Sequence, residues 1–366
     1  MIKKYYSDID VVTAARQRIK NIFDTAPRVA LAISGGKDSI VLNDIVFKMC
    51  QDGTIDKTKL TVEFIDEEAI YPCVEKIVKQ IRLQWLSIGV KFIWWCIEVR
   101  HYNCFNQLAN DESFICWDRY KQDVWVRERP SFAVTDNKYL NKRQDTYQMF
   151  VARYSKARNE IRLVGVRVSE SVQRLSSLAV KKDNSTLHPI YDFTDKDVWL
   201  YIQQNNLEIP NAYIYMYQCG VYKNKMRLSQ FFSIDTAGSL VRMCEYYPHL
   251  FDKICKREPN AYMAMLYYDT ELFRRQKQRT QVQDDDEVDY KAKTLELLFN
   301  DGFFTTKSAK SNQKCFNNLV VNYATIINNK EYKRIYNALV GGDPKHREFR
   351  AIQMAIMGRR TERSKQ

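Results

Sequence analysis

A glycine-containing hexapeptide between two apolar segments constrains the fold more than any other feature of the chain. The run from Val29 to Ile33 is almost wholly apolar, as is typical of a strand buried on both faces of a parallel sheet. After the glycines, apolar residues recur at helical spacing from Ile40 to Met49. A loop that leaves a strand and begins a helix brings backbone N–H groups and the positive helix end to one point, which favours an anion there.

The residue types within this loop suit a phosphate group. Glycine permits a close approach of the backbone and a positive φ, while the serines and Lys37 add hydroxyl donors and a cation. Asp38 is a candidate ligand for a Mg²⁺ ion that bridges phosphate oxygens. The Walker A pattern is absent, so the loop is of another type. The predicted phosphate-binding residues are Ser34, Gly35, Gly36, Lys37, Asp38 and Ser39.

Strand and helix patterns alternate on both sides of the loop. Such alternation indicates βαβ units and an α/β fold with a doubly wound, mainly parallel sheet. An amphipathic helix comes first, with Ser7 or Asp8 as its predicted N-cap and Pro27 at its end. Residues from about 100 to 150 form an aromatic-rich insertion without clear periodicity. The predicted strands are 29–33, 60–65, 90–97 and 161–165, and further helices are predicted at 74–88 and 195–205.

The pattern becomes helical throughout beyond about residue 230. We therefore predict a nucleotide-binding α/β domain over 1–235 and a helical C-terminal region over 236–366. The consecutive acidic residues within 281–289 indicate a solvated linker inside that region.

Composition narrows the classes of partner and of site. The net charge of +13 suits a polyanionic partner, and basic residues concentrate at 271–281 and from Lys345 to the end. None of the nine cysteines stands in a C-x-x-C arrangement, which argues against a local zinc or iron–sulfur site. No apolar run approaches the roughly 20 residues of a membrane span, and the first residues do not resemble a signal peptide. We expect a cytoplasmic protein.

Three ordered motifs resemble one protein family. The loop from Ser34 to Ser39 resembles the SGGxDS signature of the PP-loop, or N-type, ATP pyrophosphatases. The segment from Gly165 to Ser171, with Arg174, is similar to the G-x-R-x-x-E-S motif of the phosphoadenosine phosphosulfate (PAPS) reductase-like branch. The segment from His188 to Ile202 resembles a helix start of the same branch. The resemblance covers roughly residues 8 to 235 and implies an adenine nucleotide α-hydrolase-like fold.

Further segments narrow the resemblance to a subfamily. The opening Asp8–Val11, the strand end Phe64–Glu68, Trp117-Asp118 and the segment Trp125–Pro130 look most like the immunoglobulin-binding regulator A type. Proteins of that type are often paired with a ParB/sulfiredoxin-like partner, which the resemblance therefore implies here.

The resemblance implies roles by position. Arg167 and Arg174 would meet the phosphate or the leaving pyrophosphate, because a guanidinium matches phosphate oxygens in a bidentate manner. Asp66 would lie near the adenosine or, with Asp38, hold Mg²⁺. Lys37, Asp38 and Arg167 would be the catalytic residues. The implied nucleotide-binding set is Ser34, Gly35, Gly36, Lys37, Asp38, Ser39, Asp66, Gly165, Arg167 and Arg174.

One departure from the family changes the expected chemistry. PAPS reductases depend on a cysteine in a C-terminal Glu-Cys-Gly-Leu-His motif, which this chain lacks. Cys219 lies in Gln-Cys-Gly-Val-Tyr and comes too early in the chain. What remains is binding of ATP or PAPS and attack on the α-phosphate, which releases pyrophosphate and leaves an adenylylated acceptor.

Three functional hypotheses follow. The first is an adenylating ATP pyrophosphatase in nucleic-acid modification or defence, for which Glu68 and Asp66 are candidates to touch metal or substrate. The second is an adenine-nucleotide sensor that regulates a ParB-like partner or DNA. The third is direct nucleic-acid binding through the basic C-terminal residues, namely Arg274, Arg275, Lys277, Arg279 and the tail.

Overall fold

The chain divides into two compact units, and the first extends further than the sequence indicated. The computed structural model describes residues 8–103, 113–170, 185–221, 226, 228, 231, 242–262, 289–298, 304, 307–341, 343 and 346–363. The first unit comprises Met1–His101 and Phe114–Pro259, and the second Tyr102–Ser113 and Asn260–Gln366. The α/β unit thus continues beyond the expected boundary at 235, because α9 (Pro248–Arg257) packs against the insertion.

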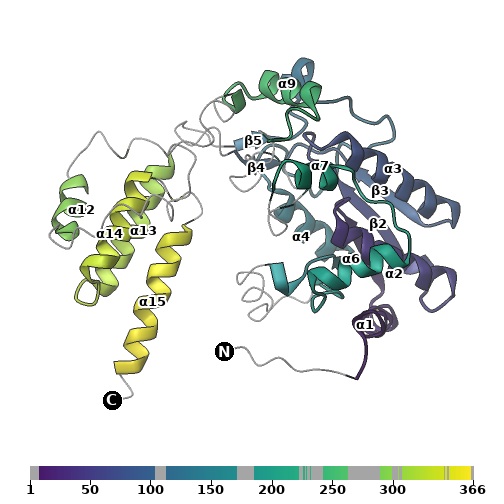
Figure 1. Cartoon of the computed structure of the whole chain (residues 1–366), viewed down its shortest axis with the longest axis horizontal. Coiled ribbons are helices and arrows are strands. Elements are labelled where there is room, and N and C mark those ends of the chain that lie inside the picture. The colour runs from purple at the N-terminus through teal and green to yellow at the C-terminus, as the bar shows by residue number, and fades with distance from the viewer. Residues whose placement is uncertain are drawn as a thin grey trace. The chain divides into compact units, whose positions relative to one another are not determined.

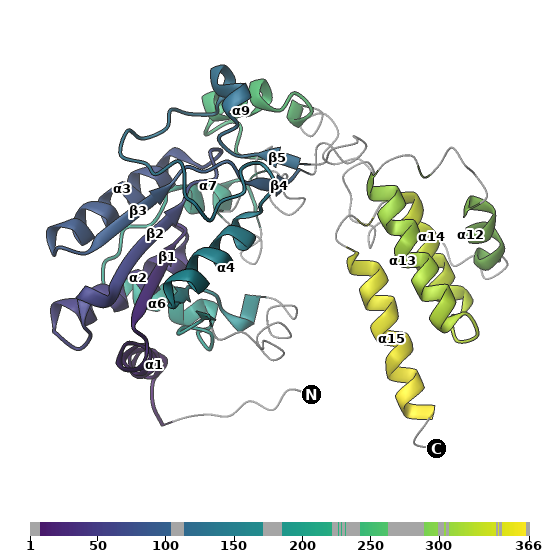
Figure 2. The same ribbon diagram turned by 180° about the vertical axis from the view of Figure 1, so that it is seen from behind.

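A five-stranded sheet forms the centre of the first unit (Figures 1 and 2). Its strand order is β3-β2-β1-β6-β7, and the neighbouring strands are parallel. β1 (Arg28–Ile33) lies in the middle, between β2 (Leu60–Ile65) and β6 (Glu160–Val164). β3 (Lys91–Trp95) and β7 (Thr186–Leu187) form the edges. The predicted α/β fold with a parallel sheet is confirmed, and β2 has the predicted bounds.

Aromatic contacts identify the helices on each face of the sheet. Successive side chains of a strand point to opposite faces. Trp95 contacts Phe150 and Tyr154 of α4 (Tyr147–Arg158). Its neighbour Trp94 contacts Phe132, which lies against the guanidinium of Arg82 in α3 (Pro72–Ser87). The face of α4 and the face of α3 are therefore opposite sides of the sheet.

One helix precedes β1, and another begins in the loop that was predicted to bind phosphate. α1 (Val11–Thr25) is capped by Asp10, whose carboxylate accepts from the backbone N–H groups of Val12 and Thr13. The predicted caps Ser7 and Asp8 were wrong, since a side-chain acceptor must lie directly before the first turn. α2 (Lys37–Gln51) begins within the loop, and Asn43 accepts a 2.7 Å hydrogen bond from the indole of Trp85 in α3.

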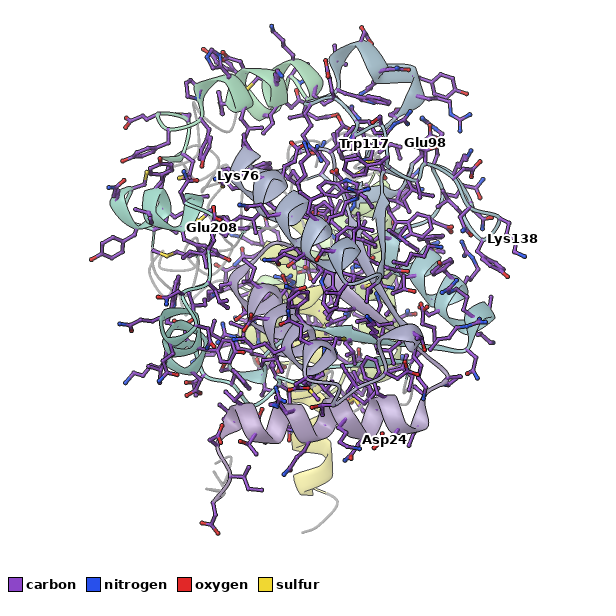
Figure 3. All side chains as sticks on the ribbon, turned by 90° about the vertical axis from the view of Figure 1, so that its right-hand side faces the viewer. Asp24, Lys76, Glu98, Trp117, Lys138 and Glu208 are labelled. Atoms are coloured by element: carbon purple, nitrogen blue, oxygen red, sulfur yellow. The ribbon has the colours of Figure 1, made fainter. Side chains whose placement is uncertain are left out.

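The second half of the unit adds short helices. α6 (Asp195–Gln204) begins with a capping box between Thr194 and Asp197, at the position predicted for a helix. α7 (Ala212–Gln218) follows it. An exposed ion pair of 3.3 Å links Lys76 of α3 to Glu208 in the connecting segment, and both residues are labelled in Figure 3.

Aromatic residues of the insertion contribute to the core. The insertion contains β4 (Arg100–Tyr102), β5 (Ser113–Ile115), the 3₁₀ segment η3 (Arg119–Val124) and the first turns of α4. Phe114, Trp117 and Phe150 are at most 1% exposed. Burial of these rings, rather than any repeating pattern, holds the insertion against the sheet.

The described elements of the second unit are helices, in agreement with the sequence. They are α12 (Tyr290–Leu298), α13 (Lys307–Tyr323), α14 (Asn329–Gly341) and α15 (Arg347–Arg363). Phe349, Ile352 and Ile356 of α15 belong to its apolar core. The expected basic tail is therefore in large part a packed helix. The cluster from Arg274 to Arg279 lies outside the described residues, as does most of the acidic segment 281–289.

Within the described residues, no helix is long and apolar enough to cross a membrane.

Candidate functional site

The loop after β1 has a backbone that only glycine accommodates at Gly35. Its φ is +73°, and a Cβ there would lie 2.7 Å from Cγ1 of Val74 in α3. Gly36 is the N-cap of α2 and supplies no side-chain cap. The amino end of a 15-residue helix is thus left to be satisfied by groups from outside the helix.

Hydroxyl oxygens accept hydrogen bonds from three of the backbone N–H groups in this loop. Gly36 N–H donates to Oγ of Ser34 over 3.3 Å, and Ser34 N–H donates to Oγ of Ser39 over 3.2 Å. Lys37 N–H donates to the hydroxyl of Tyr213 in α7 over 3.0 Å. The same hydroxyl would lie 3.4 Å from a Cβ at Gly36. These acceptors stand where phosphate oxygens would accept from the same donors.

A second glycine brings β6 against the start of α2. A Cβ at Gly165 would lie 2.9 Å from the carbonyl oxygen of Asp38 and 2.9 Å from Cα of Ser39. This close approach places Arg167, only 3% exposed, beside the loop. Nε of Arg167 donates to Oδ1 of Asp38 over 2.6 Å. The structure therefore brings together the loop and the Gly165–Arg167 segment, as the sequence predicted.

Lys37 and Arg167 share a second carboxylate that the sequence analysis missed. Nζ of Lys37 lies 3.7 Å from Oδ2 of Asp38 and 3.7 Å from Oδ1 of Asp195. Nη2 of Arg167 lies 3.4 Å from the same Oδ1 of Asp195. Asp195 is the first residue of α6, and the capping box marked that helix start but not its proximity to the loop. We call Lys37, Asp38, Arg167 and Asp195 the charge cluster.

Asp66 lies at the carboxyl end of β2, but its carboxylate is occupied. The side chain is fully buried. It accepts a hydrogen bond of 2.7 Å from the indole of Trp94 and one of 3.0 Å from the backbone N–H of Glu68. It also forms an ion pair with Arg127. The roles predicted for Asp66, in metal binding or near adenosine, do not fit this arrangement, because a ligand would have to displace Arg127 from a buried pair.

Glu68, which was predicted to touch metal or substrate, has its carboxylate engaged in a buried ion pair. Its Oε1 accepts a hydrogen bond of 2.8 Å from Nε of Arg257 in α9, and both side chains are at most 1% exposed. Its Oε2 accepts a hydrogen bond of 2.7 Å from the backbone N–H of Trp117. Burial raises the pKa of Glu68, and the contact with Arg257 opposes this shift. The pair joins the end of β2 to the insertion and to α9.

Three of the four segments that suggested a subfamily meet in one buried network, and Asp8–Val11 is not part of it. The indole of Trp117 donates a hydrogen bond of 2.7 Å to the carbonyl oxygen of Asp66. The backbone N–H of Val126 donates one of 3.3 Å to the Glu68 carboxylate. Arg127 pairs with Asp66 and, over 3.1 Å, with Glu75. These motif residues therefore hold the insertion against β2.

The two predicted magnesium ligands are both engaged by guanidinium groups. Asp38 is paired with Arg167, and Asp66 is paired with Arg127. The described part of the chain contains no group of three or more His, Cys, Asp or Glu side chains suited to a metal ion. The remaining predicted residue, Arg174, lies outside the described residues.

The described thiol nearest to the family pattern is not activated. Burial raises the pKa of Cys219, which opposes formation of the thiolate. Its Sγ lies 3.1 Å from the carbonyl oxygen of Arg242. Neither observation favours thiol-dependent chemistry at this position.

A family model matches the part of the chain that contains the second and third motifs, but not the loop at 34–39. Residues 105–220 match the model of the phosphoadenosine phosphosulfate reductase domain. The uncharacterised protein YbdN of Escherichia coli (strain K12) is 26% identical over 283 residues, which are 71% of this chain and 68% of YbdN.

Solved structures of low sequence identity are also similar in part. An FMN adenylyltransferase of Candida glabrata is 12% identical with a TM-score of 0.34, over 56% of this chain and 58% of that one. A PAPS reductase of Candida auris in complex with phosphate is 12% identical with a TM-score of 0.36, over 60% of this chain and 89% of that one. Residues 105–220, which contain the second and third motifs, thus resemble the phosphoadenosine phosphosulfate reductase domain, and the chain has a five-stranded parallel sheet of the adenine nucleotide α-hydrolase type.

Proposed function

We propose that the chain binds ATP at residues 34–39 and transfers its adenylyl group to an acceptor. A nucleophilic atom of the acceptor forms a bond to the α-phosphorus while the bond to the bridging oxygen of the β-phosphate breaks. Pyrophosphate leaves with the electron pair, and the acceptor loses its proton. The support is the convergence of Lys37 and Arg167, which are 8% and 3% exposed, at the amino end of α2.

The pairing within the charge cluster suits an exchange of partners. The charges of Lys37 and Arg167 are balanced by those of Asp38 and Asp195. The phosphates of ATP can replace the carboxylates as the partners of both cations. Lys37 is the more readily released, because its two ion-pair distances are 3.7 Å and Asp195 is 48% exposed.

Each cation has a separate role in this proposal. The planar guanidinium of Arg167 presents two parallel donors and would hold the oxygens around the α-phosphorus. The ammonium of Lys37 would neutralise the leaving pyrophosphate as a mobile point charge. The backbone N–H groups of Gly36 and Lys37 would bind a phosphate oxygen each, in place of the hydroxyls of Ser34 and Tyr213.

Magnesium enters the proposal only as the counter-ion of ATP. Asp66 stays in its buried pair with Arg127, and no step of the proposal depends on a metal held by Asp38 or Asp66.

Pyrophosphate release from ATP, with a cell extract as the source of acceptor, tests the proposal. The variants are Lys37→Ala and Arg167→Lys, and the matched control is Lys48→Ala in the last turn of the same helix, where the side chain contacts Asp44 and Asn205. We expect release to fall at least about a hundredfold in the first two variants and to be unchanged in the control. Release that persists in Lys37→Ala would contradict the proposal. PAPS is added as a competitor to decide which nucleotide the site prefers.

A regulatory function is the second candidate, and the contact between Tyr213 and the loop favours it. A phosphate that accepts from Lys37 N–H must displace the Tyr213 hydroxyl, so binding is coupled to the position of α7. Such a sensor would act on a ParB-like partner or on DNA. Tight binding of ATP without release of pyrophosphate under any condition supports this candidate over the enzyme.

A further inference from the structure

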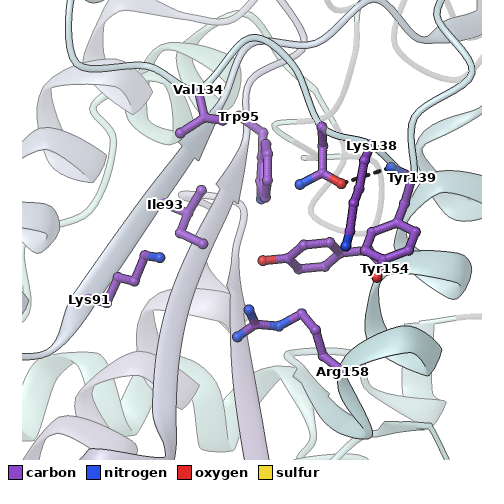
Figure 4. Close-up of a pocket in the computed structure, with 9 residues that line it drawn as sticks. Lys91, Ile93, Trp95, Val134, Lys138, Tyr139, Tyr154 and Arg158 are labelled. Atoms are coloured by element: carbon purple, nitrogen blue, oxygen red, sulfur yellow. Dashed lines mark hydrogen bonds between the residues drawn. The ribbon is translucent and has the colours of Figure 1, made fainter.

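A second pocket lies between β3 and α4, away from the loop. Its volume is about 440 Å³, within the range of about 300 to 1,000 Å³ typical of small-molecule sites. β3 contributes Lys91 and Trp95, and α4 contributes Tyr154 and Arg158 (Figure 4). Lys138 and Tyr139 complete it from the insertion.

The charged side chains that line this pocket are all cationic. They are Lys91, Lys138 and Arg158. Nε of Arg158 donates a 3.0 Å hydrogen bond to Glu160, and Glu63 also acts electrostatically on Arg158, so two carboxylates offset part of this charge. The other two cations are exposed. A pocket with this lining favours an anion over a neutral or cationic ligand.

Trp95 presents a donor whose acceptor is missing from the described residues. The side chain is 2% exposed, and its indole N–H has no hydrogen-bond partner there. Figure 4 shows the indole nitrogen on the side of the ring that faces the pocket. Because a buried donor without an acceptor is unfavourable, a ligand oxygen at this point would satisfy it.

Aromatic rings form the walls between these polar groups. The centroid of the Tyr154 ring lies 5.4 Å from that of Trp95 and 6.4 Å from that of Tyr139. The interplanar angles are 81° and 69°, so the three rings are not stacked upon one another. Such an arrangement leaves ring faces and edges available to a planar ligand.

The pocket is separate from the proposed nucleotide site. Lys91 is the first residue of β3, and Arg158 ends α4 just before β6 begins at Glu160. These cations therefore lie toward the amino ends of parallel strands, whereas the loop follows the carboxyl end of β1. The pocket extends along β3 from Lys91 to Trp95, and β2 lies between β3 and β1, the strand that the loop follows.

We propose that this pocket binds a small planar aromatic anion, in which one phosphate, sulfonate or carboxylate group is attached to a ring. The acidic group is held by the lysines, a ring substituent or acid oxygen accepts from Trp95, and the ring packs against Tyr139 and Tyr154. The proposal does not depend on turnover of ATP.

Equilibrium binding of three probes by calorimetry tests it on the full chain. Phenyl phosphate carries both features, phenol only the ring and inorganic phosphate only the charge. We expect phenyl phosphate to bind at least about tenfold more tightly than either of the others. Equal affinities for phenyl phosphate and inorganic phosphate, or no binding of phenyl phosphate at millimolar concentration, overturns the proposal.

Charge reversal locates the bound probe. The double variant Lys91→Glu/Lys138→Glu changes two exposed side chains and is expected to weaken phenyl phosphate at least about tenfold. Lys156→Glu makes the same kind of change on an exposed residue of α4 outside the pocket, and it should leave binding unchanged. Lys37→Ala should also leave it unchanged. If Lys37→Ala abolishes binding while the double variant retains it, the probe occupies the nucleotide loop and the proposal fails.

Discussion

The hydroxyl of Tyr213 accepts a hydrogen bond of 3.0 Å from the backbone N–H of Lys37, across 176 positions of sequence. The contact holds α7 against the amino end of α2, at a donor that a phosphate would otherwise use. Binding of a nucleotide at this donor must therefore break a tertiary contact of the protein.

Removal of that hydroxyl should strengthen nucleotide binding. In Tyr213→Phe the Lys37 N–H no longer has a competing acceptor, so we expect the Kd for ATP to fall about three- to tenfold, in line with a net hydrogen bond of about 0.5–1.5 kcal/mol. Calorimetric titration measures the change. Tyr217→Phe, an exposed position on the same helix, serves as the control and should bind as the wild type does. Weaker binding in Tyr213→Phe would show instead that the hydroxyl assists the nucleotide.

Gly165 should tolerate no side chain. In Gly165→Ala the new Cβ meets backbone atoms of Asp38 and Ser39 at 2.9 Å, and backbone cannot rotate away as a side chain can. We expect a loss of about 1–3 kcal/mol in the free energy of unfolding in urea, together with weaker ATP binding. Gly53→Ala is the control variant. A Cβ at Gly53 would have no atom within 4 Å, so this variant measures only the cost of placing alanine at a positive φ. An unchanged urea midpoint in Gly165→Ala would mean that β6 and α2 can separate at little cost.

The Glu68–Arg257 pair should be strongly coupled. Glu68→Gln leaves Arg257 with only the longer 3.4 Å pair to Glu258, and Arg257→Met leaves the buried Glu68 without a cation, so each should cost about 3–5 kcal/mol of unfolding free energy. The double variant should cost clearly less than the sum of the two. The exposed pair Lys76–Glu208 provides the matched cycle, with an expected coupling of about 0.2–1 kcal/mol. Additive losses in the buried cycle would be inconsistent with this pairing.

Acid should destabilise the first unit through His101. Burial lowers the pKa of His101 from 6.5 to about 4, so the folded state holds this ring neutral. A depressed folded pKa contributes stability that is present above pH 6.5 and is lost as the pH falls toward 4. Integrated over that window, the contribution is about 3 kcal/mol. His101→Phe should remove this part of the slope when unfolding midpoints are compared at pH 7 and pH 5. An identical slope in the variant would contradict the assignment.

Local patterns in the sequence were sufficient for the centre of the fold. The sequence predicted β1 and β2 from their largely apolar runs. Strands that are covered on both faces need apolar residues at successive positions, so such runs indicate buried strands. Gly35, Lys37 and Arg167 were also placed together from their motifs, and the structure brings the two motifs into contact.

Contacts between distant segments account for what the sequence did not indicate. Glu68 was expected to face a ligand, but its partner Arg257 follows 189 positions later and no local pattern marks it. Asp195 was recognised only as part of a helix start, since its proximity to Lys37 arises from the packing of α6 beside α2. The insertion has no period because its aromatic rings fill irregular space above the sheet.

The central position of β1 also bears on synthesis of the chain. On the ribosome β1 and β2 emerge first, but the other neighbour of β1 is β6, which ends at Val164. Arg167, which pairs with Asp38, is therefore synthesised 129 residues after it. A nascent chain arrested within the insertion would carry the glycine loop without its arginine. Competence to hold a nucleotide in the proposed manner is thus acquired only after β6 and the segment that follows it have left the exit tunnel.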